Sequence, residues 1–414
     1  SMPADTSGTP VSAVPDASEG DINLSQRRQA WQGAHLDEAT RTLLAEDARW
    51  FFHQSMSTPC LNALQAAEGS WLTDLAGRRI LDFHGNSLHQ VGYGHPQVMQ
   101  AMQEALATLP FSPRRYTHPA AIELAQRLCQ AAPMPEAKLL FAPGGTAAIG
   151  MALKLARLVT GRHKTVSMWD AFHGASLDAI SIGGEAVFRR GIGPLLPGTE
   201  HCPPCDPRGC VFGCAGQCAL RCADYVEYVL RKEGDVAAVV VETVRCTDVQ
   251  IPPQEYYQRL RRACDRHGAL LILDEIPIAL GRTGQLFAVE HYGIEPDMVV
   301  LGKGLGGGSM PLAAVTVWSW TGRHGDGAQG HELRAADAQA VQAVLVPRLL
   351  PAARQATLRR VRACRHDRHP GPRCPGDVLQ GPPEGRQQGD PVVPGTTHHG
   401  PGGGHVREGV RPGR

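Results

Sequence analysis

The chain has 414 residues, and its 41 Lys and Arg against 40 Asp and Glu give a formal net charge of +1. This length allows a large core and two domains, and the near-neutral charge gives no reason to expect a nucleic acid or a membrane surface as a partner. No apolar run approaches the length of a bilayer span and no secretory leader opens the chain, so we expect a cytoplasmic protein whose 12 cysteines stay reduced.

The predicted elements divide the chain into four parts. Residues 1–24 are rich in Pro, Ser, Thr and Ala and are expected to form a disordered arm. Residues 25–100 are expected to contribute to a small domain. Their pattern is helical to about residue 68, and "WLTDLAGRRILDF" then predicts two short strands around a glycine turn. Residues 101–318 are expected to form a large domain, and residues 319–414 an aberrant, poorly ordered tail.

Helix and strand patterns alternate from residue 137 onward. Strand "AKLLFA" precedes helix "TAAIGMALKLARLVTG" and strand "KTVSMW"; after an insertion come helix 217–233, strand "VAAVVVE", helix 254–267, and strands "ALLILDE" and "DMVVLG". The strands are continuous apolar runs, which is typical of strands covered by helices on both faces. The pattern predicts an α/β domain with a mostly parallel sheet.

The tail differs in composition from the rest of the chain. After Trp320 there is no Lys, Ile, Phe, Tyr, Asn, Ser, Met or Trp, and Arg, Gly, Pro, Ala and His dominate. Because the change falls inside what should still be core, we favour a loss of reading frame near residues 308–317. A natural disordered tail is the alternative.

Four polar groups follow the predicted strands: Glu242, Asp274, Lys303 and the loop "PGGT" at 143–146. Ligands of open α/β sheets bind outside the carboxyl ends of the strands, so these groups are expected to converge. A buried lysine tends to lose its proton and become a nucleophile, and a buried carboxylate needs a cation or a strong donor. Pyridoxal 5′-phosphate (PLP) uses both, and a glycine-rich helix start holds its phosphate.

The motifs resemble those of the class III aminotransferases, a family of PLP enzymes of fold type I. The resemblance covers about residues 25–318 and rests on "GGTAAIGMALKLAR", "WDAFHGAS", "VVVETV", "LILDEIPIALGRTG" and "LGKGLGGGSMPLAAV", in that order. It implies a mostly parallel seven-stranded sheet covered by helices, with a small C-terminal domain that is altered or missing here. It also implies a cytoplasmic homodimer acting on a small-molecule amine, although the changed tail puts dimer assembly in doubt.

The resemblance assigns roles to single residues. Lys303 would form the Schiff base with PLP and move the proton, while Asp274 would pair with the pyridine nitrogen. The remaining cofactor-binding positions are Gly145 and Thr146 at the phosphate, Phe172 and Ile276 on the two ring faces, His173 in the motif after Phe172, and Glu242 near the cofactor or the substrate entrance. Each residue taken alone also has an ordinary structural interpretation. Lys303 could be an exposed loop lysine, Asp274 could cap a helix, and Phe172 and His173 could be buried core residues without a functional role.

Several positions depart from the family pattern. Thr243 stands where the family has proline, and Pro277 stands where it has a glutamine that bonds the cofactor. These departures bring the chain closest to a subgroup associated with an (R)-1-hydroxy-2-aminoethylphosphonate ammonia-lyase, which would release ammonia instead of transferring it. A threonine that the family takes from the neighbouring subunit is not recognisable after Trp320, so a third possibility is an inactive remnant.

Two further features carry weaker hypotheses. The cysteine-rich insertion, residues 201–222, has C-x-x-C spacing that suggests a structural zinc on Cys202, Cys205, Cys210 and Cys214, with free thiols as the alternative. Arg114 and Arg115 are candidates for binding an anionic substrate group such as a phosphonate, and equally for ordinary surface arginines.

Overall fold

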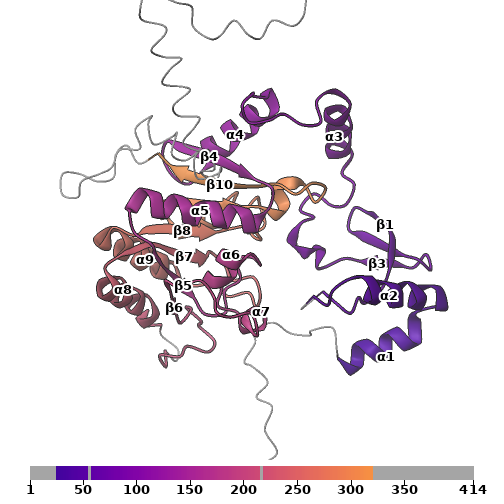
Figure 1. Ribbon diagram of the computed structural model, residues 1–414, viewed down its shortest axis with the longest axis horizontal. Helices are drawn as coiled ribbons and strands as arrows, with labels where there is room; N and C mark the ends of the chain where they lie inside the picture. The colour runs from indigo at the N-terminus through magenta and orange to yellow at the C-terminus, as the bar shows by residue number, and fades with distance from the viewer. Residues whose placement is uncertain (1–24, 55–56, 215–217, 320–414) are drawn as a thin grey trace, which may run out of the picture. The chain divides into compact units, whose positions relative to one another are not determined.

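The computed structural model describes residues 25–54, 57–214 and 218–319, which Figure 1 shows in colour. The predicted arm, residues 1–24, and the predicted tail beyond Ser319 lie outside the described residues. None of the helices in the described part is long and apolar enough to cross a membrane.

The N-terminal segment begins with two capped helices, α1 (Gln26–His35) and α2 (Glu38–Trp50). The Ser25 side chain accepts a hydrogen bond from the backbone of Arg28 at 3.2 Å, and Asp37 accepts one from Thr40 at 2.8 Å. These oxygens satisfy N–H groups that the first turn of a helix leaves free.

A three-stranded antiparallel sheet follows, built from β1 (Leu64–Glu68), β2 (Trp71–Asp74) and β3 (Arg79–Leu81). The two strands predicted around the glycine turn are confirmed as β2 and β3. The helical expectation for residues up to 68 is wrong for residues 64–68, which form β1. The local pattern favoured a helix there, but the hydrogen bonds between β1 and β2 decide in favour of a strand.

Two helices lead from this segment to the main sheet, and each begins with a proline at its first position. They are α3 (Pro96–Thr108) and α4 (Pro119–Ala131), with the short η1 (Gly85–Ser87) before them. Proline suits this position because its missing N–H and its fixed φ match the first turn of a helix.

The main sheet has seven strands in the order β4-β10-β9-β8-β7-β5-β6. Their bounds are β4 (Ala137–Ala142), β5 (Lys164–Met168), β6 (Thr199–Cys202), β7 (Val236–Glu242), β8 (Leu270–Asp274), β9 (Met298–Leu301) and β10 (Ala313–Trp318). Strands β5 to β9 pair in parallel, and β10 runs antiparallel between β4 and β9. The predicted mostly parallel seven-stranded sheet is confirmed, and β10 carries its regular pairing through Trp318.

Helices cover both faces of the sheet. Alternate strand residues point to opposite faces: Val240, Ile272 and Val300 lie in the core under α5 (Gly145–Thr160), whereas Val241 and Leu273 lie in the core under α8 and α9. Figure 1 shows α5 lying along the sheet, whereas α8 (Arg221–Glu233) and α9 (Gln254–His267) lie apart from α5. The apolar strands are therefore continuous because both of their faces are buried.

The boundaries of these helices follow from residues in the left-handed region. Gly161, Gly234 and Gly268 end α5, α8 and α9 with φ between +61° and +70°. The helix expected at 217–233 begins at Arg221, because Leu220 takes a φ of +56° and interrupts it. Shorter helices complete the domain: α6 (Leu177–Ile182), α7 (Ala186–Arg189), η2 (Ala288–Tyr292) and η3 (Lys303–Gly306).

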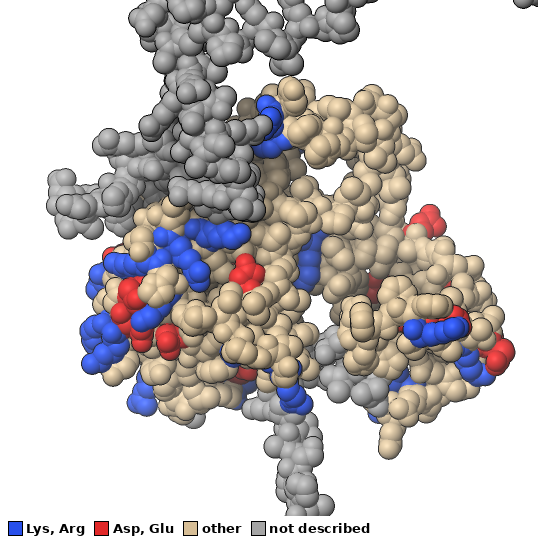
Figure 2. Space-filling view, viewed as in Figure 1, with Lys and Arg blue, Asp and Glu red and all other residues tan. Residues whose placement is uncertain are grey.

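The surface over α8 and α9 mixes charges of both signs. Figure 2 shows basic side chains gathered there with acidic ones between them. Arg259 pairs with Asp224 at 2.7 Å, and Arg266 pairs with Glu227. These ion pairs offset part of the positive charge on this face.

Candidate active site

The predicted groups meet at the carboxyl ends of the central strands. Glu242 ends β7 and Asp274 ends β8, and the two residues are direct partners in the parallel register of these strands. Lys303 follows the end of β9 at Leu301 and opens η3, where it is partly buried. The strand order therefore brings two carboxyl groups and an amine to one edge of the sheet.

Asp274 forms a buried hydrogen-bonded pair with His173, which lies in the loop after β5. The Nδ1 atom of His173 is 2.8 Å from Oδ2 of Asp274, and both side chains are almost completely buried. Burial by itself lowers the pKa of His173, but the hydrogen bond and the charge of Asp274 outweigh it and hold the pKa above its ordinary value. The pair thus buries the carboxylate of Asp274 against an imidazole whose pKa that carboxylate raises.

Asp274 also accepts a hydrogen bond on its other oxygen, from the backbone of Ile276 at 3.0 Å. Each carboxylate oxygen can accept two hydrogen bonds and each has one here, so acceptor capacity is left for two more donors. The carboxylate is thereby held in one orientation from two sides.

Glu242 is the second buried carboxyl group at this edge, and its hydrogen bonds are longer than those of Asp274. Its oxygens accept long hydrogen bonds from the backbone N–H groups of Phe172, at 3.3 Å, and Cys246, at 3.5 Å. Burial raises the pKa of Glu242 to about 7; the charge of Asp274 adds to this effect, and His173 opposes it. Near neutral pH this carboxyl group is therefore divided between its charged and neutral forms.

Three glycines near the start of α5 and the end of β9 leave little or no room for a side chain. A Cβ atom on Gly145 would lie 2.8 Å from Cδ1 of Ile276, and one on Gly302 would lie 3.1 Å from Cγ2 of the same residue. Gly174, with a φ of +129°, would bring a Cβ atom to 3.0 Å from the Cβ atom of Thr146. Ile276 thus connects the start of α5 with the strand end that carries Lys303.

These contacts allow a test of whether PLP fits the site. Helix α5 begins at Gly145, and its N-cap residue Gly144 provides no side-chain oxygen, so the first N–H groups are open to a phosphate. The buried carboxylate of Asp274 suits a protonated ring nitrogen, and Lys303 supplies an amine at the same edge of the sheet. The residues present fit the cofactor.

Comparisons with known proteins agree with this geometry. The family model "Aminotransferase class-III" matches residues 52–346. The chain belongs to the class III aminotransferase family. The match ends beyond Ser319, the last described residue, so part of it falls in the predicted tail.

Three relatives illustrate the range of the family. The chain is 48% identical over 313 residues to an (R)-1-hydroxy-2-aminoethylphosphonate ammonia-lyase from Vibrio splendidus (strain 12B01), covering 72% of this chain and 65% of the relative. It is 36% identical over 255 residues to a putrescine aminotransferase from Pectobacterium atrosepticum, covering 60% of this chain and 52% of that one. The solved taurine:2-oxoglutarate aminotransferase from Bifidobacterium kashiwanohense, in complex with PLP and glutamate, has a TM-score of 0.61 and 26% identity, covering 68% of this chain and 66% of that one. The chain thus spans about two thirds or less of the length of these relatives.

The two departures from the family pattern have local explanations. Thr243, at the family's proline position, donates its hydroxyl to Oε1 of Glu275 at 3.0 Å. Glu275 also accepts the backbone N–H groups of Ala288 at 2.8 Å and Val289 at 2.7 Å, and so fixes the start of η2. Pro277 is buried in the turn that follows Asp274, where Ile278 and Ala279 donate their backbone N–H groups to the carbonyl oxygen of Glu275 at 3.1 and 3.0 Å, so the turn uses no N–H group from residue 277.

Three polar residues at this edge were not singled out from the sequence as structural partners. Glu275 and Thr243 form the buried contact described above, and Arg245 forms an ion cluster in the loop after β7. The only sequence signal for them was charge or hydroxyl groups directly next to apolar strands. A buried charged group or hydroxyl requires an ionic or hydrogen-bonding partner, and the sequence pattern does not show which residue that partner is.

The predicted zinc site is not supported. In the described residues no group of three or more His, Cys, Asp and Glu side chains is arranged to hold a metal. Of the predicted ligands, Cys202 and Cys205 are buried and Cys210 and Cys214 are partly exposed; Cys205 instead lies beside Cys222. The cysteine spacing was compatible with ligation, but α8 and the core divide the thiols between the interior and the surface.

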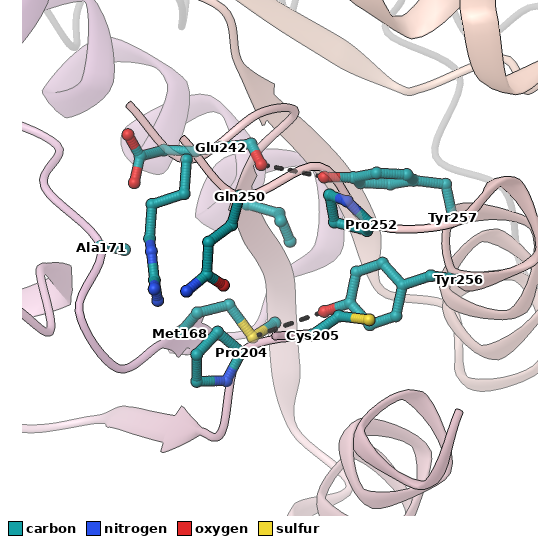
Figure 3. A pocket seen from close by; sticks show the side chains of 11 residues that line it. Met168, Ala171, Pro204, Cys205, Glu242, Gln250, Pro252, Tyr256 and Tyr257 are labelled. Carbon is teal, nitrogen blue, oxygen red and sulfur yellow. Dashed lines mark hydrogen bonds between the residues drawn. The ribbon is translucent and has the colours of Figure 1, made fainter. Parts of the chain in front are cut away.

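A small cavity is lined in part by Glu242. Its volume is about 30 Å³, which is room for about one or two water molecules and not for a cofactor. Figure 3 shows Met168, Gln250, Tyr256 and Tyr257 in its wall, with Tyr257 bonded to the backbone oxygen of Glu242 at 2.9 Å.

Two other predicted residues are not brought to the cluster by any contact. Arg114 and Arg115 lie exposed in the turn before α4. Phe172 is partly buried and packs against Phe188, with ring centroids 4.5 Å apart. Its backbone contact with Glu242 places it at the edge of the site.

Proposed function

We propose that this chain is a PLP-dependent enzyme that acts on a primary amine, with Lys303 as its central residue. The observation that carries the proposal is the buried His173–Asp274 pair at 2.8 Å, next to the open start of α5 and the strand end before Lys303. When bound, PLP supplies an aldehyde carbon that condenses with amines and a ring that takes up electron density from the carbon next to the nitrogen.

Each residue of the cluster then has a chemical task. Lys303 would hold the cofactor through its Nζ amine and, when free, would take up the proton from the amine-bearing carbon of the substrate. Asp274, oriented by His173 and by the backbone of Ile276, would face the ring nitrogen. The first turn of α5, with Gly145 and Thr146, would hold the phosphate.

The other wall residues shape the pocket. Ile276 would pack on one face of the cofactor ring and Phe172 on the other; Ile276 lies against Gly145, and the backbone N–H group of Phe172 contacts Glu242. Glu242 lies beside them with a pKa of about 7, as a consequence of burial. A carboxyl group of this kind is suited to exchange a proton near neutral pH.

A second candidate function is release of ammonia from a hydroxylated aminophosphonate. It is supported by the 48% identity to the ammonia-lyase and by Thr243 and Pro277 at the two positions that depart from the family pattern. Proton removal by Lys303 serves both reactions, so the two candidates differ in their products. Free ammonia formed without a keto acid supports the lyase, and dependence on an amino acceptor supports the transferase.

We also propose that the working protein is a cytoplasmic homodimer. The family's active sites form between two subunits, and the ten cysteines in the described part of the chain are free thiols, which supports a reducing compartment. Size-exclusion chromatography with light scattering tests the assembly. A purely monomeric chain would support the alternative of an inactive remnant.

The test of the central proposal uses the full chain with added PLP. We expect a visible absorbance band and, after borohydride reduction and peptide mapping, a pyridoxyl group on Lys303. Lys303→Ala abolishes both signals, whereas Lys154→Ala, which changes an exposed lysine on α5, leaves them unchanged. Labelling spread over surface lysines would refute the proposal.

A further inference from the structure

Arg245 is a buried cation at the carboxyl edge of the sheet, in the loop that follows Glu242. Its side chain is 8% exposed, and it grips Asp248 with two hydrogen bonds, Nε to Oδ1 at 2.7 Å and Nη2 to Oδ2 at 2.6 Å. A two-point contact of this kind fixes direction as well as distance. The loop is closed further by paired backbone hydrogen bonds between Arg245 and Gln250, each 3.1 Å long.

The same guanidinium reaches two other loops. Its Nη1 atom donates to Oδ2 of Asp170 at 3.3 Å, in the loop after β5, and its Nη2 atom lies 4.0 Å from Oδ2 of Asp206, in the segment after β6. Gln250 donates its amide to Asp206 and, at 2.7 Å, to Asp248. One arginine therefore links the loops that follow β5, β6 and β7.

Two of these linked loops also hold the Glu242 carboxyl group. The N–H group of Phe172, two residues after Asp170, donates to one oxygen, and the N–H group of Cys246, next to Arg245, donates to the other. The distance between these two donors depends on how far apart the loops after β5 and β7 lie. The ion pair between Arg245 and Asp170 joins the same two loops.

Arg245 is not available to bind a substrate anion. Its Nε, Nη1 and Nη2 atoms each face a carboxylate, and their combined negative charge exceeds its own. Arg208, 58% exposed, supplies a second cation at the rim through Asp248 at 2.9 Å. Three carboxylates thus face two cations, so the cluster offers no spare positive charge to a substrate anion, and its effect is on the geometry of the loops.

We propose that Arg245 is a positioning residue. By joining the loops after β5 and β7, it fixes the positions of Phe172 and the Glu242 carboxyl group relative to the cofactor. The inference rests on the proposed function, because these positions matter for binding only if the cofactor binds at this edge. It assigns a task to a residue that falls outside the motifs by which the family was recognised.

The mildest test is Asp170→Asn, which removes only the charge that crosses the gap. Asp170 has a φ of +62°, a conformation that asparagine also tolerates, so the backbone is undisturbed. Arg245→Gln removes the whole link, and Arg208→Gln is the matched control, since it removes a cation of the same cluster that does not contact Asp170.

Two readouts are taken for each variant. The first is the Kd for PLP, measured from the visible absorbance and dichroism of the bound cofactor. The second is the alkylation rate of Cys246 by iodoacetamide in the cofactor-free protein, with fully buried Cys264 of α9 as an internal reference for global unfolding. Burial and the nearby Glu242 raise the pKa of Cys246 to about 12, so alkylation is slow while the loop is closed.

We expect Asp170→Asn to raise the Kd for PLP and the alkylation rate of Cys246 by about two- to fivefold, the range of a partly exposed ion pair. Arg245→Gln raises both by about tenfold or more, and Arg208→Gln changes neither by more than about twofold. Arg245→Lys keeps the charge but loses the two-point contact with Asp248, so its Kd for PLP and its Cys246 alkylation rate are expected to lie between those of wild type and Arg245→Gln.

The inference is overturned if Asp170→Asn and Arg245→Gln match Arg208→Gln in both readouts. Should Arg245→Gln expose Cys264 as well, that variant is unfolded and Asp170→Asn decides. A wild-type chain that takes up no PLP refutes the proposed function instead, and the alkylation rates then still decide whether Arg245 holds the loop.

Discussion

Replacing Glu242 by glutamine is expected to remove a pH dependence from the stability of the cofactor-free protein. The carboxyl group is buried, and only two long N–H contacts, at 3.3 and 3.5 Å, support its charge. Burial therefore raises its pKa from the ordinary 4.5 to about 7. A shift of this size corresponds to about 3 kcal/mol between the protonated and ionised forms.

The sign follows from which state holds the proton. Between pH 4.5 and about 7 the unfolded chain has released its Glu242 proton while the folded protein still holds it, so the free energy of unfolding falls as pH rises. His173 also has a raised pKa, so its stabilising contribution is lost as pH rises above its ordinary 6.5. The charge of Glu242 contributes to that raised pKa, so the difference between wild type and Glu242→Gln reports the carboxyl group together with its interaction with His173.

The assay is urea unfolding from about pH 5 to about pH 8, followed by tryptophan fluorescence. Relative to wild type, Glu242→Gln is expected to gain up to about 3 kcal/mol across this range. The amide NH₂, which must face one of the two backbone donors, adds a cost that does not depend on pH, so it lowers the whole Glu242→Gln profile without changing this difference. Parallel pH profiles for the two proteins would refute the reasoning, because Glu242 would then titrate normally in the folded state.

Three further predictions follow from the geometry. Asp274→Asn leaves His173 without its ionic partner and should lower turnover by about a hundredfold or more, measured by single-turnover kinetics with saturating PLP. Gly174→Ala forces a methyl group against Thr146 at a φ of +129° and should weaken PLP binding by about tenfold or more in an absorbance titration; equal affinity would contradict the close packing. Asp297→Leu removes the buried partner of Arg261, whose Nη1 atom lies 2.6 Å from the carboxylate, and leaves Arg261 with the half-exposed Asp265 at 2.8 Å; it should cost about 3–5 kcal/mol in urea unfolding, and a loss below about 1 kcal/mol would show that the pair is solvated.

The insertion illustrates where prediction from sequence failed. Cysteine spacing suggested a zinc site, but thiols bind a metal only if the fold brings three or four of them to one point. Here Cys202 and Cys205 face the core while Cys210 and Cys214 are partly exposed, so the spacing alone was misleading. The strand at residues 64–68 was missed for a related reason, because its partner β2 decides its conformation.

The sequence by itself determined the sheet and the positions of the reactive groups. Continuous apolar strands ending in Glu242 and Asp274, and a glycine-rich turn before α5, specify local structure, and parallel strands bring their carboxyl ends to one edge. Only the tertiary structure decided which groups became partners. The contact of His173 with Asp274 and the grip of Arg245 on Asp170 join residues about 100 and 75 positions apart, and such pairs form because burial makes an unpaired charge too costly.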